Sequence, residues 1–484
     1  MLQNIEPAMV WKHFEALNAV PRPSKKEERV IQFMLDFGKG LNLETLQDSA
    51  GNVIIRKPAT KGFEDRKTVV LQSHLDMVHQ KNEDTDFDFD KEGIKMYVDG
   101  DWVKAKGTTL GADNGLGVAS IMGILSSNDI EHPPLEALFT IDEETGMTGA
   151  KELDPTILKG DILLNLDTEE DDEIGIGCAG GVDITATRFY IEESIPEQSQ
   201  ALQITIKGLQ GGHSGMDIIK GLGNANKLQN RLLFNLHKHF QIKLASVNGG
   251  GLRNAIPRES QSVIIVLNKE LDDLKAAFNT EKENILSEYK SLEPHLSITL
   301  SETDSPKSVL TSDVQDMIIK ALQAAHNGVY RMSPDVEGLV ETSNNIARVL
   351  IGEGKIQISC LTRSSVESGK WDLAHSLESA FDLAGCNVKF SGDYPGWAPN
   401  PDSEILNLVD RLYQEKFKEK GNIAACHAGL ECGILGSHYP NMDMVSFGPT
   451  IRGAHSPDER ASISSTQKFW SFLLDILKHI PEKK

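Results

Sequence analysis

The sequence predicts an α/β protein in which one discontinuous α/β domain is interrupted by an inserted antiparallel α+β domain. Three observations predict it. In the first part of the chain, apolar and β-branched runs alternate with helical patterns. In the middle, apolar and polar residues alternate one by one. Near the C-terminus the alternation of strand-like and helical stretches returns. A chain of 484 residues also exceeds the size at which a single hydrophobic core keeps growing.

The first domain is expected to hold a largely parallel sheet. Residues 68–72, 135–141 and 161–166 are runs rich in β-branched residues and leucine, which is typical of strands buried on both faces. A helix is expected over 116–125. Ser24 and Glu27 have the spacing of a capping box ahead of a helix. This domain is assigned to 1–186 and 400–484.

The inserted domain is assigned to 187–399. Its first strand is expected at 201–207, where apolar residues alternate with polar ones. Helices and strands then follow in the order β-α-β-β-α-β, the ferredoxin-like arrangement. A comparable series from 311 to 391 suggests two related halves. The turn-rich stretch that starts at Tyr394 marks the return to the first domain.

Composition narrows the function. The formal charge of −22 argues against nucleic acid and membrane surfaces as partners. No run approaches about 18 apolar residues, and the N-terminus lacks the apolar core of a signal peptide. The five cysteines are an odd number without a Cys-x-x-Cys pair, so neither a disulfide framework nor a thiolate zinc site is indicated. We therefore expect a cytoplasmic location.

Candidate chemical residues follow the buried runs, where sites form in open α/β sheets. His74 and Asp76 follow the first run, Glu143 and Glu144 the second, and Asp167 the third. Singly, each has an ordinary structural explanation: a His-x-Asp triplet is most often structural, and adjacent acidic strand ends would repel each other without a counter-charge.

Two more candidates lie outside these strand ends. Asp113 stands at the start of the expected helix, where it could serve as a plain N-cap. His455 lies in a loop, where a lone histidine is more often a surface residue. As a set, however, imidazoles and carboxylates at one sheet edge are the ligands of zinc or another first-row divalent ion. Of the two adjacent glutamates, one can bind metal while the other moves a proton.

These motifs resemble those of the dinuclear metallopeptidase family that contains carnosinases, glutamate carboxypeptidase and acetylornithine deacetylase. The resemblance is carried by His74-Leu-Asp76, Gly111-Ala-Asp113-Asn-Gly, Glu143-Glu144-Thr-Gly, Asp167 and His455, and it extends over almost the whole chain. It implies a catalytic domain with the two-metal aminopeptidase fold and an inserted lid domain that supports a homodimer.

The resemblance also implies a role for each residue. His74 and Asp167 would bind one metal, Glu144 and His455 the other, and Asp113 both. Glu143 would be the general base and Asp76 the residue that orients His74, both catalytic. An aspartate at position 167 matches the peptidase branch of the family. His213, Asn254 and Arg363 resemble the substrate-binding residues of related dipeptidases, although a tight turn would explain His213 and ordinary hydrogen bonding the other two.

The implied reaction is hydrolysis of unblocked dipeptides, Xaa-His dipeptides such as carnosine among them, by a metal-activated water. Two divalent ions per subunit are expected, zinc first, with manganese and cobalt left open. Two alternatives remain at this point. One is an N-acyl-amino-acid deacylase of the same family, and the other is a non-catalytic protein that binds a metal or a peptide.

Overall fold

The protein consists of two compact units in a computed structural model that describes residues 2 and 4–483. The first unit comprises Met1–Gly177, Pro399–Ala425 and Leu430–Lys484, and the second comprises Cys178–Ala398 and Cys426–Gly429. The expected α/β fold is confirmed. Along the described residues, each helix is too short or too polar to cross a lipid bilayer.

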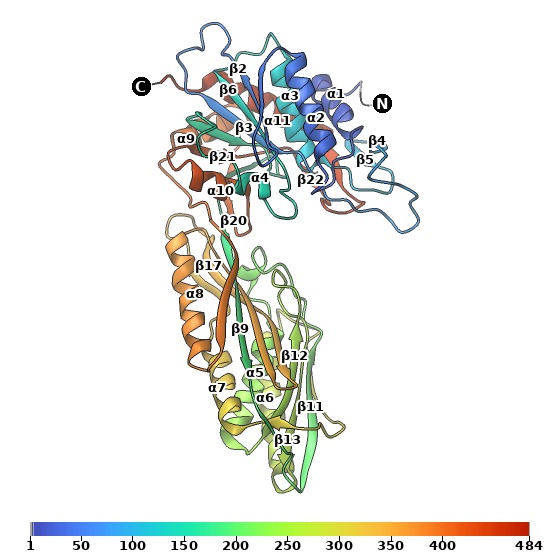
Figure 1. Ribbon diagram of the computed structural model, residues 1–484, viewed down its shortest axis with the longest axis vertical. Coiled ribbons are helices and arrows are strands. Elements are labelled where there is room, and N and C mark those ends of the chain that lie inside the picture. Colours follow the sequence, from blue (N-terminus) through green and yellow to red (C-terminus); the bar gives the residue numbers. More distant parts are fainter. Residues whose placement is uncertain (1, 3, 484) are drawn as a thin grey trace. The chain divides into compact units, whose positions relative to one another are not determined.

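The first unit is built on a mixed sheet with the strand order β1-β2-β6-β3-β7-β21-β8-β20 (Figure 1). Its strands are β1 (Glu44–Gln47), β2 (Val53–Lys57), β3 (Val69–His74), β6 (Leu135–Thr140), β7 (Ile162–Asn165), β8 (Glu173–Cys178), β20 (Asn422–Cys426) and β21 (Asp443–Ser446). A small sheet of β22 (Ile451–Arg452), β23 (Arg460–Ser462), β5 (Trp102–Ala105) and β4 (Met96–Asp99) lies in the same unit.

The centre of the large sheet is parallel. Strand β3 pairs in parallel with both β6 and β7, and β7 pairs in parallel with β21. Strands β3, β6 and β7 are buried along their whole length, as their apolar runs predict. The carboxyl ends of four parallel strands therefore meet at one edge, where open α/β sheets place their sites.

Helices cover this sheet, and α1 packs against α3 (Figure 1). The helices of the first unit are α1 (Ala8–Asn18), α2 (Glu28–Gly40), α3 (Ala112–Ser126), α4 (Thr148–Lys151), α9 (Glu404–Phe417), α10 (Glu431–His438) and α11 (Ile463–His479). The predicted capping box is wrong. Helix α2 begins at Glu28, and the Ser24 hydroxyl donates instead to Asp76 Oδ2 at 2.7 Å. A hydrogen bond to an ionised carboxylate is stronger than one between neutral groups, so Ser24 serves Asp76.

The second unit is an antiparallel sheet made of two ferredoxin-like halves. The strand order is β14-β11-β13-β12-β17-β18-β9-β19. The elements β11, α5, β12, β13, α6 and β14 form one β-α-β-β-α-β half. In the other half β9 is the first strand and is followed by α7, β17, β18, α8 and β19. The first half is thus inserted after the first strand of the second half.

The elements of the second unit have the following bounds. The strands are β9 (Gly180–Phe189), β10 (Glu192–Glu193), β11 (Ser199–Lys207), β12 (Lys243–Gly250), β13 (Ser260–Leu267), β14 (Ser297–Glu302), β15 (Val309–Leu310), β16 (Gly328–Met332), β17 (Val340–Gly352), β18 (Lys355–Ser364) and β19 (Asn387–Tyr394). The helices are η1 (Ile218–Lys220), α5 (Ala225–His239), η2 (Asn268–Glu270), α6 (Leu271–Tyr289), α7 (Ser312–Ala324) and α8 (Glu367–Asp382).

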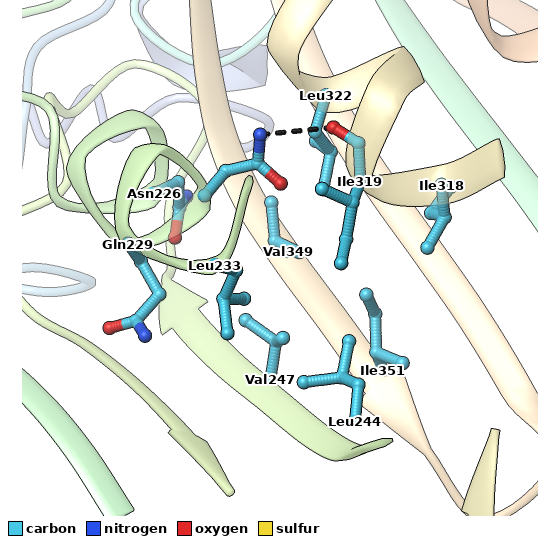
Figure 2. Close-up of a pocket in the computed structure, with 11 residues that line it drawn as sticks. Asn226, Gln229, Leu233, Leu244, Val247, Ile318, Ile319, Leu322, Val349 and Ile351 are labelled. Atoms are coloured by element: carbon cyan, nitrogen blue, oxygen red, sulfur yellow. Dashed lines mark hydrogen bonds between the residues drawn. The ribbon is translucent and has the colours of Figure 1, made fainter. Parts of the chain in front are cut away.

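The two halves meet where β12 pairs with β17 and α5 packs on α7. Figure 2 shows the apolar side chains at this junction, among them Leu233, Val247 and Val349, around a small hollow. Its volume is about 10 Å³, the space of a single water probe. The hollow is a packing gap between the halves and is too small for a ligand.

The glycines at the end of β12 are required by close backbone approach. An added Cβ on Gly249 would lie 2.0 Å from Asn226 Oδ1. Gly250 has φ +73°, and its Cβ would lie 1.8 Å from the Ala347 carbonyl oxygen on β17. On Gly251 an added Cβ meets nothing within 4 Å. The run of three glycines is therefore explained at two positions by strand pairing between the halves.

We predict that Gly250→Ala destabilises the protein by about 1–3 kcal/mol or more, because the alanine must keep a left-handed backbone and displace a carbonyl. Gly251→Ala is the matched control and should change stability by no more than about 0.5 kcal/mol. Urea unfolding followed by circular dichroism measures both variants. Equal stability of the two would contradict the close approach.

Candidate metal centre

The predicted ligands of the first unit come together at the carboxyl edge of its parallel strands. His74 is the last residue of β3, Glu143 and Glu144 follow β6, and Asp167 follows β7. Asp113 comes from the first residues of α3 and His455 from the loop after β22. Five separate stretches of chain thus deliver their polar groups to one place.

His74 is fixed on both ring nitrogens. Its side chain is 1% exposed. Nδ1 lies 3.1 Å from the Asp76 carbonyl oxygen and 3.4 Å from Asp76 Oδ1. Nε2 faces Asp113 Oδ1 at 3.2 Å and Asp167 Oδ1 at 3.5 Å. Nδ1 thus has the backbone and carboxylate partners that orient a metal-binding imidazole, and Nε2 points at the two aspartates.

His455 faces a second pair of carboxylates. Its Nε2 lies 3.1 Å from Asp113 Oδ2 and 3.0 Å from Glu144 Oε2. The two oxygens of Asp113 therefore point at different imidazoles. Hydrogen bonds that the His455 ring donates to Asp113 and Glu144 raise the pKa of His455 to about 11. The protonated His455 ring places a positive charge between the Asp113 and Glu144 carboxylates, where a metal cation would also be favoured.

The donor atoms fit divalent metal ions. One nitrogen or oxygen each of His74, Asp113 and Glu144 lie within 4.8 Å of one another. Glu144 Oε1 and Asp167 Oδ1 are buried without a hydrogen-bond partner among residues 2 and 4–483. A buried carboxylate oxygen left unpaired is costly. Mixed imidazole and carboxylate donors are those that zinc and related ions bind.

Asp76 holds the turn that carries the two glutamates. Its side chain is fully buried. Its Oδ1 accepts from the Glu143 N–H at 3.0 Å and its Oδ2 from the Glu144 N–H at 3.2 Å. Burial would raise the pKa of Asp76, but its contacts with His74 and Ser24 keep that pKa below the ordinary value. The carboxylate therefore stays ionised and aligns both glutamates as well as His74.

Glu143 is a half-buried carboxyl group at this cluster. Loss of solvent raises the pKa of Glu143 well above its ordinary value, and the Asp167, Glu431 and Glu144 carboxylates raise it further. Burial likewise raises the pKa of Asp167 to about 6. A carboxyl group whose pKa is raised beside other charged groups is a candidate for proton transfer.

Asp113 does not cap its helix. The backbone at Asp113 is non-helical, with φ −79° and ψ 111°, and the peptide bond to Asn114 is cis. Glu459 binds the N–H groups of Ala112 and Asp113, which come before the helical part of α3 resumes, and the two Asp113 oxygens face His74 and His455. The plain N-cap that the sequence left open is therefore excluded, and the Asp113 carboxylate is free to face the imidazoles.

Two of the predicted substrate-binding residues lie side by side in the second unit. His213 forms a β-bridge with Ala255, and the Ser214 N–H donates to the Asn254 carbonyl at 2.8 Å. His213 Nδ1 accepts from the Gly215 and Met216 N–H groups at 3.2 and 3.0 Å. The tight turn expected as an alternative for His213 is thus present, and it leaves Nε2 to carry the ring proton as a donor.

The third, Arg363, lies on β18 in the same unit and is 5% exposed. Its Nη1 donates to the Tyr394 hydroxyl at 2.7 Å, while Nε is buried with no partner in the described part of the chain. Burial lowers the pKa of His213, and the Arg363 charge lowers it further. Burial and Arg363 also lower the pKa of His427 to about 3. Arg363 therefore keeps a donor and a full charge available next to two neutral imidazoles.

Sequence reasoning missed several residues that support the site. Glu431 is buried, and its Oε2 accepts from Gln72 Nε2 at 2.7 Å and Thr140 Oγ1 at 2.6 Å. Gln72 Oε1 in turn accepts from Asn165 Nδ2 at 2.5 Å. The polar Gln72 within an apolar strand was the available signal, because a buried amide needs partners. Arg22 and Glu459 were also missed.

Comparison with known proteins identifies the family of this chain. The model of peptidase family M20/M25/M40 matches residues 70–479. The chain is 45% identical over 482 residues to the cytosol non-specific dipeptidase of Escherichia coli (strain K12), with 100% of this chain and 99% of that protein covered. The family resemblance read from the motifs is confirmed.

Solved structures give the same result for the fold. The aminoacylhistidine dipeptidase from Vibrio alginolyticus has a TM-score of 0.96 and 46% identity, covering 100% of this chain and 99% of that one. The aminopeptidase PepT from Bacillus cereus has a TM-score of 0.57 at 15% identity, covering 98% and 99%. At this low identity PepT shows a shared fold only.

The buried Glu431 predicts a pH dependence of stability. Burial raises the pKa of Glu431 from 4.5 to about 8, so the folded protein holds an extra proton between these values. Stability must then fall as the pH rises through that window, by about 1.4 kcal/mol for each pH unit. Metal-free Glu431→Gln should lose less stability than the metal-free wild type in urea unfolding between pH 5 and pH 8. Parallel pH profiles would contradict this.

Proposed function

The chain belongs to peptidase family M20/M25/M40, and from that membership and the site we propose that it hydrolyses unblocked dipeptides with two divalent metal ions. It is a metal-dependent peptide hydrolase. The observation that carries the proposal is the half-buried Glu143, with its raised pKa, beside the cluster of His74, Asp113 and Glu144. A protein that only binds metal has no need of that additional carboxyl group.

The metal ligands divide into two sets that share Asp113. His74 and Asp167 would hold one ion, and Glu144 and His455 the other. Support comes from the two oxygens of Asp113, which face different imidazoles. Zinc is the proposed ion, with manganese and cobalt as substitutes. When bound, such ions lower the pKa of a water and polarise a carbonyl group.

Glu143 is proposed as the general base. It takes a proton from the attacking water and passes it to the leaving amine. Its place in the turn held by Asp76 and its raised pKa support this role, because a higher pKa makes the carboxylate a stronger proton acceptor. Asp76 contributes by holding the Glu143 and Glu144 N–H groups and the His74 ring.

The second unit supplies the proposed substrate-binding groups. Arg363 would bind the C-terminal carboxylate of the dipeptide, which suits a buried guanidinium with an unpaired Nε in the described structure. His213 would donate from Nε2 to the oxyanion of the tetrahedral intermediate, and Asn254 would hold the substrate backbone. A group that binds the free C-terminal carboxylate would favour short, unblocked peptides. The two dipeptidases similar over the full chain support this substrate class.

The proposed assembly is a homodimer through the second unit, in the cytoplasm. Phe189, Ile191 and Leu383 of this unit are 78%, 83% and 83% exposed, which is unusual for large apolar side chains unless a partner covers them. The similar Escherichia coli protein is named a cytosol enzyme. The cysteines of the described chain are thiols rather than disulfides, which suits a reducing compartment.

The runner-up function is deacylation of N-acyl amino acids. The purified enzyme should be given a free dipeptide such as carnosine, the amide of the same dipeptide, and an N-acetyl amino acid. Rapid cleavage of the free dipeptide alone is the expected result, since the amide lacks the carboxylate for Arg363. Faster cleavage of the N-acetyl amino acid would show that the enzyme is a deacylase and not a dipeptidase.

We predict that Glu143→Gln lowers kcat by about 10²–10⁴-fold, because the carboxamide cannot accept the proton of the water. Both metal ions should stay bound, which elemental analysis of the variant can check. Glu152 is exposed, and Glu152→Gln is the matched control with unchanged turnover. Near-normal rates in Glu143→Gln would remove Glu143 from its role.

A further inference from the structure

The carboxylate of Glu459 binds a series of consecutive backbone N–H groups at the start of α3. Its Oε2 accepts from Leu110 at 2.6 Å and Gly111 at 2.9 Å. Its Oε1 accepts from Ala112 at 2.7 Å and Asp113 at 3.3 Å. Each oxygen thus receives two donors. Such a ring of N–H groups around one anion is normally a ligand-binding feature, and here a side chain of the same protein fills it.

Arg22 holds the opposite, carbonyl side of the same loop. Its side chain is 1% exposed, and Nη2 donates to the Gly111 carbonyl at 2.6 Å. Nη1 donates to the carbonyls of Leu75 and Asp76 at 3.0 and 3.1 Å. The guanidinium therefore joins the Asp113 loop to the end of β3, where His74 lies. A side chain on Gly111 would collide with Arg22, since its Cβ would lie 2.5 Å from Nη2.

Glu459 also connects two ligands that are far apart in the sequence. It lies four residues after His455, in a loop closed by the Ser456 N–H to the Gly453 carbonyl at 3.2 Å and the Glu459 N–H to the Ser456 carbonyl at 3.0 Å. The same short loop therefore carries His455 at one end and the carboxylate that binds the Asp113 N–H at the other. A movement of His455 therefore displaces Asp113, and a movement of Asp113 displaces His455.

Glu459 itself is not a candidate ligand. Glu459 is 2% exposed, and both of its carboxylate oxygens accept hydrogen bonds from backbone N–H groups. Glu459 binds the N–H group of Asp113, so these two residues are joined through the backbone and not through the Asp113 carboxylate. The Asp113 carboxylate is left to face His74 and His455.

We propose that Glu459 is a positioning residue that fixes Asp113 and His455 relative to each other before metal binds. The inference rests on the proposed function, since it assumes that these two residues are metal ligands. Partners behind metal ligands typically contribute about 10–100-fold to metal affinity or activity. Glu459→Gln keeps the shape of the side chain but turns an NH₂ group toward two backbone donors, so the loop must shift.

The test titrates cobalt(II) into chelator-treated full-length protein and follows binding by calorimetry and by the visible absorption of the bound ion. In Glu459→Gln we expect binding about tenfold weaker or more, with a changed cobalt spectrum. With the zinc-loaded enzyme, kcat for a dipeptide should fall about tenfold or more while KM stays within about twofold. Glu459→Asp keeps the charge on a shorter arm and should recover part of the affinity.

Asp458→Asn is the matched control, because it removes the same charge from an exposed neighbour in the same loop. It should bind cobalt like the wild type. Circular dichroism checks that each variant folds. If Glu459→Gln does not fold, the cobalt affinity of Glu459→Asp tests the inference in its place. Wild-type affinity and spectrum in a folded Glu459 variant would overturn the inference. A wild-type protein that binds no cobalt would overturn the proposed function instead.

Discussion

The structure of the first unit depends on one electrostatic constraint, the concentration of negative charge at one sheet edge. Asp113, Glu144 and Asp167 converge there with Glu143 close by, and carboxylates in such a place repel each other and are costly to bury without a counter-charge. The two imidazoles give partial compensation, since both have a pKa above the ordinary value. The buried Oε1 of Glu144 remains without a hydrogen-bond partner within the described chain, and divalent cations would complete the charge balance there.

Around this centre, polar side chains act mainly on the backbone. Asp76 holds the Glu143–Glu144 turn, Glu459 holds the Asp113 loop, and Arg22 joins that loop to the end of β3. Glu143, Glu144 and Asp113 are thus held through their backbone N–H groups, while His74 is held through its ring. Asp76, Glu459 and Arg22 bind backbone N–H and carbonyl groups. The carboxylate oxygens of the metal ligands therefore stay available to a metal ion.

Much of the fold and of the site was predictable from local pattern. Buried runs ahead of His74, Glu143 and Asp167 became parallel strands, since a strand covered on both faces must be apolar throughout. Other features depend on residues far apart in the chain. Strand β9 belongs to a half whose other elements begin at Ser312, and Glu459 caps a loop that starts at Leu110. Ser24 matched a capping pattern, but Asp76, brought near by folding, took its hydroxyl.

We propose that these ligands hold a pair of divalent cations. A chelator removes the metal from purified, active protein and the metal is then restored, with metal content and activity measured at each step. Two bound ions per chain are expected, with loss of dipeptide hydrolysis on chelation and recovery with zinc, manganese or cobalt. Full activity in protein free of transition metal would show that the cluster holds no catalytic ion.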